Sequence, residues 1–170
     1  KFIILMAKWL KKLHKHKKPC KKHSMLKAVK PYFRNVNNHK NAIPPEIAHK
    51  IDSLFRRVTS FCKKNDGIFS NRKEASLLHR DLSRKNIIYD GKEIRLLDWE
   101  FSNYNFPEWD LVYFIQSLGL NKKQMGLFLK AYGYSTNKAG KKRLLIISLL
   151  NTCGDIGYSV WRLGLVKDGK

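Results

Sequence analysis

The 170-residue sequence is poor in cysteine, in carboxylates and in long apolar runs. Its 3 cysteines, Cys20, Cys62 and Cys153, are too few and too widely spaced for a disulfide framework or a cysteine metal site, and they favour a reducing compartment. The longest nearly continuous apolar stretch, residues 144–150, is far shorter than the ~20 residues that cross a bilayer. These absences predict a cytoplasmic protein without a membrane span.

Acidic residues are outnumbered by basic ones. There are 13 Asp and Glu against 35 Lys and Arg, which gives a formal net charge of +22. This charge fits either a nucleic-acid footprint or an amino-acid bias of the source. The lysines form one dense block, residues 11–23, and are otherwise scattered, without the interleaved aromatic residues that single-strand binders use for stacking. We therefore do not expect a nucleic-acid partner.

The apolar pattern predicts an α+β fold, mostly helical around a small β-hairpin. The composition, 43% hydrophobic and 28% charged, is that of one globular domain. A polar, Asn-rich loop with a short helical piece is expected over residues 17–45, and Asp90-Gly91 predicts a two-residue hairpin turn. Helices are expected over residues 6–16, 46–62, 107–119, 122–132, 139–152 and 154–166, and strands over residues 75–79, 86–89 and 93–97.

The few carboxylates are concentrated in one region, because seven of the 13 lie between Asp81 and Asp110. A two-residue turn at Asp90-Gly91 places Asp98 opposite Ser83, at the end of the hairpin that also carries Asp81 and Asn86. Carboxylate and amide oxygens are ligands that Mg²⁺ accepts, with substrate phosphates completing the shell. The pattern therefore predicts a metal–phosphate site here.

The spacing His-x-Asp-x-x-x-x-Asn, followed by a hairpin and Asp, is typical of kinase catalytic loops. In that arrangement Asp81 accepts the proton of the attacking hydroxyl, while Asn86 and Asp98 hold Mg²⁺. We expect His79 to brace the loop rather than to catalyse. Taken singly, these residues have ordinary explanations: a solvated loop acid, a turn residue and a strand-end cap. Their joint spacing favours the kinase interpretation.

The stretch "LLHRDLSRKNIIYDGKEIRLLDWEFSNYNFPEWDL", residues 77–111, resembles the catalytic core of the aminoglycoside phosphotransferase and choline kinase superfamily, and is most similar to its choline/ethanolamine kinase branch. The resemblance implies a protein-kinase-like fold and ATP- and Mg²⁺-dependent transfer of a γ-phosphoryl group to a small alcohol. It implies that Asp81 is the catalytic base and that Asn86 and Asp98 are Mg²⁺ ligands. Asp110 would steady the loop backbone, or else merely complement a helix dipole.

The parts that clamp ATP phosphates in such kinases, a Gly-rich loop and a strand Lys paired with a helical Glu, are not found in the sequence. We therefore expect these residues to form the C-terminal lobe alone, with the N-terminal lobe missing and with poor ATP binding by the isolated chain. Within it, residues 1–16 resemble the helix after the interlobe linker. Residues 75–110 would hold the catalytic and metal-binding loops, and residues 120–170 a helical substrate-binding subdomain.

A choline acceptor requires aromatic faces and an acid, because a quaternary ammonium has no N–H to donate. The family's choline pocket uses a Trp-bearing helix, and the C-terminal segment is similar: Asp155, Tyr158 and Trp161 share one helical ridge. These aromatic residues have core packing as the alternative. Further candidate walls are Trp99, Glu100, Tyr104 and Trp109.

Other functions are less well matched by the sequence. Aminoglycoside binding needs more acids than the C-terminal half offers, although another small-molecule acceptor or a non-catalytic kinase-fold fragment stays open. A protein kinase is a weaker alternative, because the short interval between Asp98 and Asp110 leaves no room for an activation loop.

Overall fold

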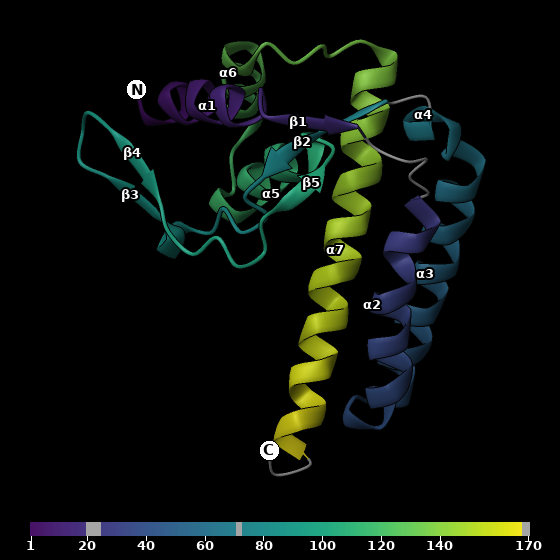
Figure 1. Ribbon diagram of the computed structural model, residues 1–170. Coiled ribbons are helices and arrows are strands. Elements are labelled where there is room, and N and C mark those ends of the chain that lie inside the picture. Colours follow the sequence, from purple (N-terminus) through teal and green to yellow (C-terminus); the bar gives the residue numbers. More distant parts are fainter. Residues whose placement is uncertain (20–24, 71–72, 168–170) are drawn as a thin grey trace. The chain divides into compact units, whose positions relative to one another are not determined.

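The computed structural model describes residues 1–19, 25–70 and 73–167, and most of them are helical (Figure 1). The helices are α1 (Phe2–Leu13), α2 (Met25–His39), α3 (Pro45–Asn65), α4 (Gly67–Ser70), α5 (Glu108–Leu118), α6 (Lys122–Tyr132) and α7 (Lys138–Lys167), with short 3-10 helices η1 (Lys40–Ala42) and η2 (Arg84–Asn86). The strands are β1 (Lys17–Pro19), β2 (Glu74–Leu78), β3 (Ile87–Tyr89), β4 (Ile94–Leu96) and β5 (Asn103–Asn105).

The chain folds as two compact units. Unit 1 comprises Lys1–Lys21 and Arg72–Ile147, and unit 2 comprises Lys22–Asn71 and Ser148–Lys170. Helix α7 contributes residues to both units. All the strands, and the loops predicted to be catalytic, belong to unit 1.

Unit 1 contains two small antiparallel sheets. Strand β2 lies between β1 and β5, so that Ser76 pairs with Lys17 on one side and Asn105 on the other. The second sheet is the predicted hairpin of β3 and β4. Because β2 buries Ala75 and Leu78, its end is fixed in the core, and the next residue begins the candidate catalytic loop.

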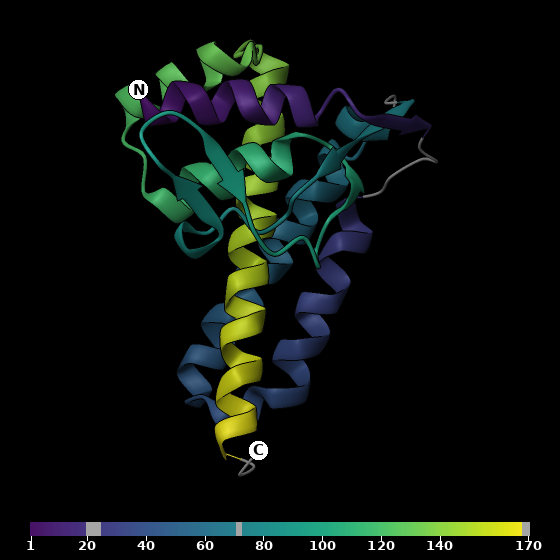
Figure 2. The same cartoon turned by 60° about the vertical axis from the view of Figure 1, so that its left-hand side comes forward.

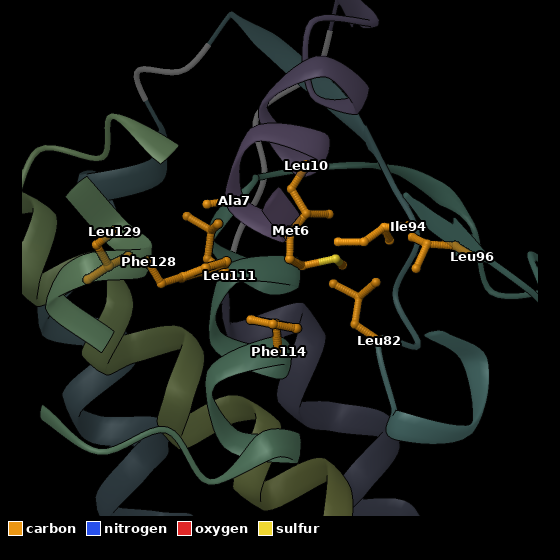
Figure 3. Packing of buried hydrophobic residues seen from close by; sticks show 10 residues of the cluster. All are labelled: Met6, Ala7, Leu10, Leu82, Ile94, Leu96, Leu111, Phe114, Phe128 and Leu129. Atoms are coloured by element: carbon orange, nitrogen blue, oxygen red, sulfur yellow. The ribbon is translucent and has the colours of Figure 1, made fainter. Parts of the chain in front are cut away.

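The core of unit 1 forms around α1 (Figure 3). Met6, Ala7 and Leu10 are fully buried on one face of this helix, as expected for apolar residues spaced by one turn. Leu82, from the candidate catalytic loop, is also fully buried in this cluster. The loop is therefore anchored to α1 by apolar packing. The rest of the cluster is Ile94, Leu96, Leu111, Phe114, Phe128 and Leu129.

The predicted helices after residue 107 have clear end signals. Helix α5 ends at Gly119 and α6 at Gly133, with φ of 63° and 83°, a left-handed conformation that glycine adopts without steric cost. Helix α6 begins with a capping box, in which Asn121 and Gln124 each accept the other's backbone N–H. These two helices confirm the sequence prediction almost to the residue.

The predicted two-residue hairpin turn is wrong. Tyr89 pairs with Ile94, so the connection is a four-residue loop, residues 90–93. Asp90 Oδ1 accepts the backbone N–H groups of Glu93 (2.7 Å) and Lys92 (2.8 Å), which stabilise this wider turn and lower the pKa of Asp90. Consequently Asp98 does not lie opposite Ser83.

Other elements also differ from the prediction. Residues 25–39 form the 15-residue helix α2 rather than a loop, although Pro31 lies inside it. Packing outweighs local propensity here, because Phe33 of α2 stacks edge-on against Phe55 of α3 with ring centroids 4.6 Å apart. The two helices expected beyond residue 138 are a single 30-residue helix, α7. Strands β1 and β5 were not predicted.

Unit 2 consists of α2, η1, α3, α4 and the C-terminal part of α7, and α2 and α3 run beside α7 in both views (Figure 2). The approach of α2 to α7 depends on glycine. A Cβ added at Gly157 would lie 3.2 Å from both the Cα and the carbonyl oxygen of Tyr32. Cys62 and Cys153 are buried in this unit, and burial raises the pKa of each thiol to about 11. Cys20 lies outside the described residues.

Among the described residues, α7 is the one helix long and apolar enough to cross a membrane by length and composition alone. This is a weak indication, since a core helix of a soluble protein passes the same test, and 33% of its most apolar window is buried. The absence of a membrane span therefore stays a prediction.

We expect Gly157→Val to destabilise unit 2 by about 1–3 kcal/mol, because the side chain would press on the backbone of Tyr32 rather than on a movable side chain. Urea unfolding followed by circular dichroism measures the change. Gly126→Val in α6 is the matched control, since a Cβ there meets nothing within 4 Å. Equal stabilities of the two variants would contradict this account of the packing.

Candidate active site

The candidate catalytic loop starts at His79, directly after β2, and its backbone is held by the buried carboxylate of Asp110. Asp110, in the first turn of α5, accepts the backbone N–H of His79 with Oδ2 and that of Arg80 with Oδ1, both at 2.9 Å. Arg80 has a φ of 75°, which is unfavourable for a residue with a Cβ. The paired hydrogen bonds to Asp110 stabilise the loop in this conformation.

A histidine that the sequence analysis did not single out shares this carboxylate. His14, next to the C-terminus of α1 and 4% exposed, places Nε2 3.2 Å from Asp110 Oδ2 and Nδ1 2.8 Å from the hydroxyl of Tyr132. Because an ionised carboxylate only accepts hydrogen bonds, Nε2 carries a proton, and in the neutral ring Nδ1 accepts from Tyr132. His14 therefore links α1 and α6 to the catalytic loop.

His79 connects two segments of the site. Its Nε2 donates to the carbonyl oxygen of Leu97 (2.9 Å), and its Nδ1 accepts the backbone N–H of Asp81 at 3.3 Å. The ring is fully buried and lies 4.6 Å from that of Trp99. His79 thus connects Leu97, directly before Asp98, to the backbone of Asp81, which agrees with a bracing role.

Asp81 and Asn86 are in direct contact. Asn86 Nδ2 donates to Asp81 Oδ2 (2.8 Å) and to the Asp81 carbonyl oxygen (3.1 Å), while the hydroxyl of Tyr113 donates to Asp81 Oδ1 at 3.0 Å. The reversed amide would set Asn86 Oδ1 against two oxygen atoms, so the donors fix its orientation. The amide oxygen therefore points away from Asp81. Tyr113, on α5, was missed because a half-buried helix tyrosine has no distinguishing sequence signal.

Asp98 is brought to the same end of the hairpin by the strand pairing. The backbone N–H of Leu97 donates to the carbonyl oxygen of Asn86 at 2.9 Å, so Asp98 follows the residue paired with Asn86. Asp98 is exposed, has a φ of 60°, and its carboxylate has no hydrogen bond or ion pair to any described residue. In a chain of charge +22, an unpaired carboxylate in a left-handed conformation is a candidate functional group.

The donor set fits a Mg²⁺ ion that keeps several non-protein ligands. Asn86 Oδ1 and the Asp98 carboxylate would supply two hard oxygen ligands, which is the usual protein share when substrate phosphates and water supply the rest. Within the part of the chain that the structure describes, no group of three or more His, Cys, Asp or Glu forms a metal cage. Such a sparse set predicts weak metal binding without nucleotide.

Other acids of the region have structural contacts instead. Glu108 is fully buried and accepts from Arg143 Nε (3.0 Å) and from the hydroxyl of Tyr134 (2.9 Å), which joins α5 to the start of α7. Burial and the nearby Glu108 charge raise the pKa of Tyr134. With Asp90 in the hairpin loop and Asp110 under the catalytic loop, three of the seven clustered acids therefore have contacts that explain them without a metal.

The residues proposed for acceptor binding fall into three groups. The first group is Trp99, Glu100 and Tyr104. Trp99 is 38% exposed and its Nε1–H donates to the Leu96 carbonyl oxygen (3.2 Å), and Glu100 is exposed. The Lys18 ammonium lies 4.5 Å from the centre of the Tyr104 ring. Trp109 is only 3% exposed and stacks under Arg80, so it is a core residue and not a pocket wall.

The third group is Asp155, Tyr158 and Trp161, which belong to α7 within unit 2. The rings of Tyr158 and Trp161 lie 5.5 Å apart, as expected for one helical ridge, and partial burial raises the pKa of Asp155. Their part in an acceptor pocket stays a prediction.

Comparisons with known proteins agree on one family. The family model "Choline/ethanolamine kinase" matches residues 1–154. A protein LicA homolog of Metamycoplasma hominis is 37% identical over 87 residues, which cover 49% of this chain and 35% of that protein. Protein LicA of Haemophilus influenzae is 26% identical over 87 residues, or 49% of this chain and 33% of that protein.

Solved structures show the fold. A choline/ethanolamine kinase family protein from Mesorhizobium loti matches with a TM-score of 0.72 at 19% identity, over 99% of this chain and 55% of that one. Choline kinase LicA from Streptococcus pneumoniae matches with a TM-score of 0.67 at 21% identity, over 99% of this chain and 56% of that one. The predicted kinase-like fold is confirmed. The chain spans about half the length of these structures and about a third of the curated relatives.

We expect His14→Leu to lower the free energy of unfolding by about 1–3 kcal/mol, because Asp110 would keep its buried charge but lose a hydrogen-bond donor. Chemical denaturation measures the change. Tyr132→Phe, which removes only the hydroxyl next to Nδ1, is expected to cost about 1 kcal/mol.

His16→Leu is the matched control for this prediction, because His16 is exposed and its backbone rather than its ring is used, with the carbonyl oxygen accepting from Leu77. A cost within about 0.5 kcal/mol is expected there. A His14→Leu variant as stable as the His16→Leu variant would contradict the role of His14.

Proposed function

The chain belongs to the choline/ethanolamine kinase family, and from this premise we propose that it is the catalytic lobe of an ATP-dependent kinase for a small alcohol. The acceptor would be choline or ethanolamine. The observation that carries the proposal is the Asp81–Asn86 hydrogen bond, with Asp98 directly following Leu97, whose backbone N–H pairs with Asn86. A phosphoryl-transfer site needs this combination of a base and two metal ligands.

In the proposed reaction Asp81 accepts the proton of the acceptor hydroxyl. Tyr113 and Asn86 each hold one oxygen of its carboxylate, so the group is oriented before the substrate arrives. The alcohol oxygen forms a bond to the γ-phosphorus as the bond from that phosphorus to the β,γ-bridging oxygen breaks, and ADP leaves. Bound Mg²⁺, held by Asn86 Oδ1 and Asp98, would offset the negative charge on the phosphates.

His79 and Asp110 would act by position rather than by contact with substrate. His79 sets the distance between the Asp81 backbone and the segment that leads to Asp98. Asp110 fixes the left-handed turn at Arg80, directly before Asp81. A displacement of about 1 Å in such a site costs on the order of 100-fold in rate.

The proposal requires a phosphate clamp that these 170 residues do not provide. We propose that a separate N-terminal lobe carries the Gly-rich loop and the lysine. The match to about half the length of the solved structures supports this. For the acceptor, we propose that the ammonium group meets Trp99, Glu100 and Tyr104 of unit 1. Asp155, Tyr158 and Trp161 of unit 2 are a separate candidate set for the same role.

The proposal is tested by Asp81→Asn in the full-length protein that contains this chain. We expect kcat for choline or ethanolamine phosphorylation to fall about 100- to 10,000-fold while KM changes little, because the base acts in the transition state. Turnover is measured by ADP release at saturating MgATP.

Asp90→Asn is the matched control, because it makes the same chemical change in an exposed hairpin-loop acid whose side chain contacts only backbone N–H groups. Its kcat should stay within about twofold of the unmodified protein. Undiminished turnover in the Asp81→Asn protein would overturn the assignment of the base, and turnover with neither alcohol would overturn the acceptor class.

A further inference from the structure

Helix α1 has a stripe of lysines on the face opposite its buried residues. Lys8, Lys11 and Lys12 are exposed and recur at one-turn spacing, and Lys15 continues the stripe just beyond the helix. The buried side of the same helix carries Met6, Ala7 and Leu10. The lysines therefore lie on the surface of unit 1 by the periodicity of the helix.

Helix α6 adds a second group of lysines beside the first. Its exposed residues include Lys122, Lys123 and Lys130, and it packs along α1 through the shared core (Figures 1 and 2). The first group reaches the C-terminal end of α6, where a Cβ at Gly133 would lie 3.1 Å from Lys11 Nζ. The lysines of both helices thus form one basic surface.

No acid offsets this charge on the helices themselves. Residues 1–45 and 111–154 contain no Asp or Glu, and within the described residues the lysines of α1 and α6 form no ion pair. Glu93 lines a groove of about 400 Å³ together with Lys8, Lys12 and Lys92. Even this groove carries more positive than negative charge.

Two exposed aliphatic side chains lie among these lysines. Ile4 is 36% exposed within the α1 stripe, and Leu127 is 45% exposed between Lys123 and Lys130. Lysines that surround aliphatic side chains suit the headgroup region of an anionic bilayer, which takes up both groups.

Nucleic acid fits this surface less well. Base stacking needs aromatic faces, and the exposed aromatic residues of the described chain, Trp99, Phe101 and Tyr158, do not lie on α1 or α6. The basic residues here are all lysine, whereas arginine is preferred for bidentate phosphate contacts.

We propose that this surface docks reversibly on an anionic lipid bilayer. It is called the lysine face and consists of Ile4, Lys8, Lys11, Lys12, Lys122, Lys123, Leu127 and Lys130. Attraction by several lysines steers the chain to the membrane, and the two aliphatic side chains enter the headgroup boundary. This role is separate from phosphoryl transfer, because none of these residues belongs to the candidate active site.

The test is sedimentation of the full-length protein that contains this chain with vesicles. Vesicles of phosphatidylcholine are compared with vesicles in which about a third of the lipid is phosphatidylglycerol. We expect binding to the anionic vesicles only, and its loss when NaCl rises from about 0.05 M to 0.5 M, because salt screens surface charge.

Two triple variants test the location. The first variant alters the lysine face by Lys8→Gln, Lys12→Gln and Lys130→Gln. It should weaken binding about 100-fold, or about fivefold per lysine. The second variant removes the same charge from exposed positions of α3 by Lys50→Gln, Lys63→Gln and Lys64→Gln. It should keep most of the affinity for anionic vesicles. Unchanged circular dichroism spectra would show that both variants fold.

Three outcomes would overturn the proposal. The first is equal binding to neutral and anionic vesicles. The second is equal loss in both triple variants, which would assign the attraction to net charge alone. The third is displacement of the chain from anionic vesicles by polyuridylic acid at matched phosphate concentration, which would assign the face to nucleic acid. A tenfold weaker affinity of Leu127→Asn would support the entry of this side chain into the bilayer.

Discussion

One buried carboxylate determines the geometry of the candidate site. Asp110 accepts two consecutive backbone N–H groups, those of His79 and Arg80, as well as Nε2 of His14. A fully buried charge is stable only when its hydrogen bonds are made, so the loop backbone and the carboxylate stabilise each other. Because Asp110 belongs to α5 and His14 follows α1, the position of the loop depends on how these two helices pack.

The acids near the candidate site differ in how their oxygen atoms are used. The carboxylates of Asp90, Glu108 and Asp110 accept hydrogen bonds from backbone N–H groups or from specific side chains. Asp81 is oriented by two donors, whereas the Asp98 carboxylate has no hydrogen bond or ion pair to the described residues. Structural acids are satisfied by the protein itself, while a metal ligand must keep oxygen atoms for the metal. The contacts thus separate the three structural acids from Asp98, the proposed metal ligand, which sequence clustering alone does not.

The sequence predicted what depends on local pattern. The capped helices after residue 107 and the spacing of Asp81, Asn86 and Asp98 were found because turn, cap and motif signals lie within a few residues. The hairpin register was missed because Asp90 can stabilise a wider loop with its own carboxylate. Helix α2 was missed because its stability comes from packing against α3. Contacts such as His14 with Asp110 join residues remote in sequence and leave no local signal.

Backbone strain gives a further argument for a functional site. Among the described residues, Arg80 and Asp98 are the two non-glycine residues with positive φ, and both lie beside the pair formed by Asp81 and Asn86. Glycine at position 98 would relieve the strain at little cost to packing, since Asp98 is exposed. Asp110 holds the backbone at Arg80, and His79 Nε2 holds the carbonyl oxygen of Leu97, directly before Asp98. Such local strain, held in place by nearby hydrogen bonds, fits a preorganised phosphoryl-transfer site. In such a site the oxygen atoms of Asp81, Asn86 and Asp98 must be in position before the charged substrate arrives.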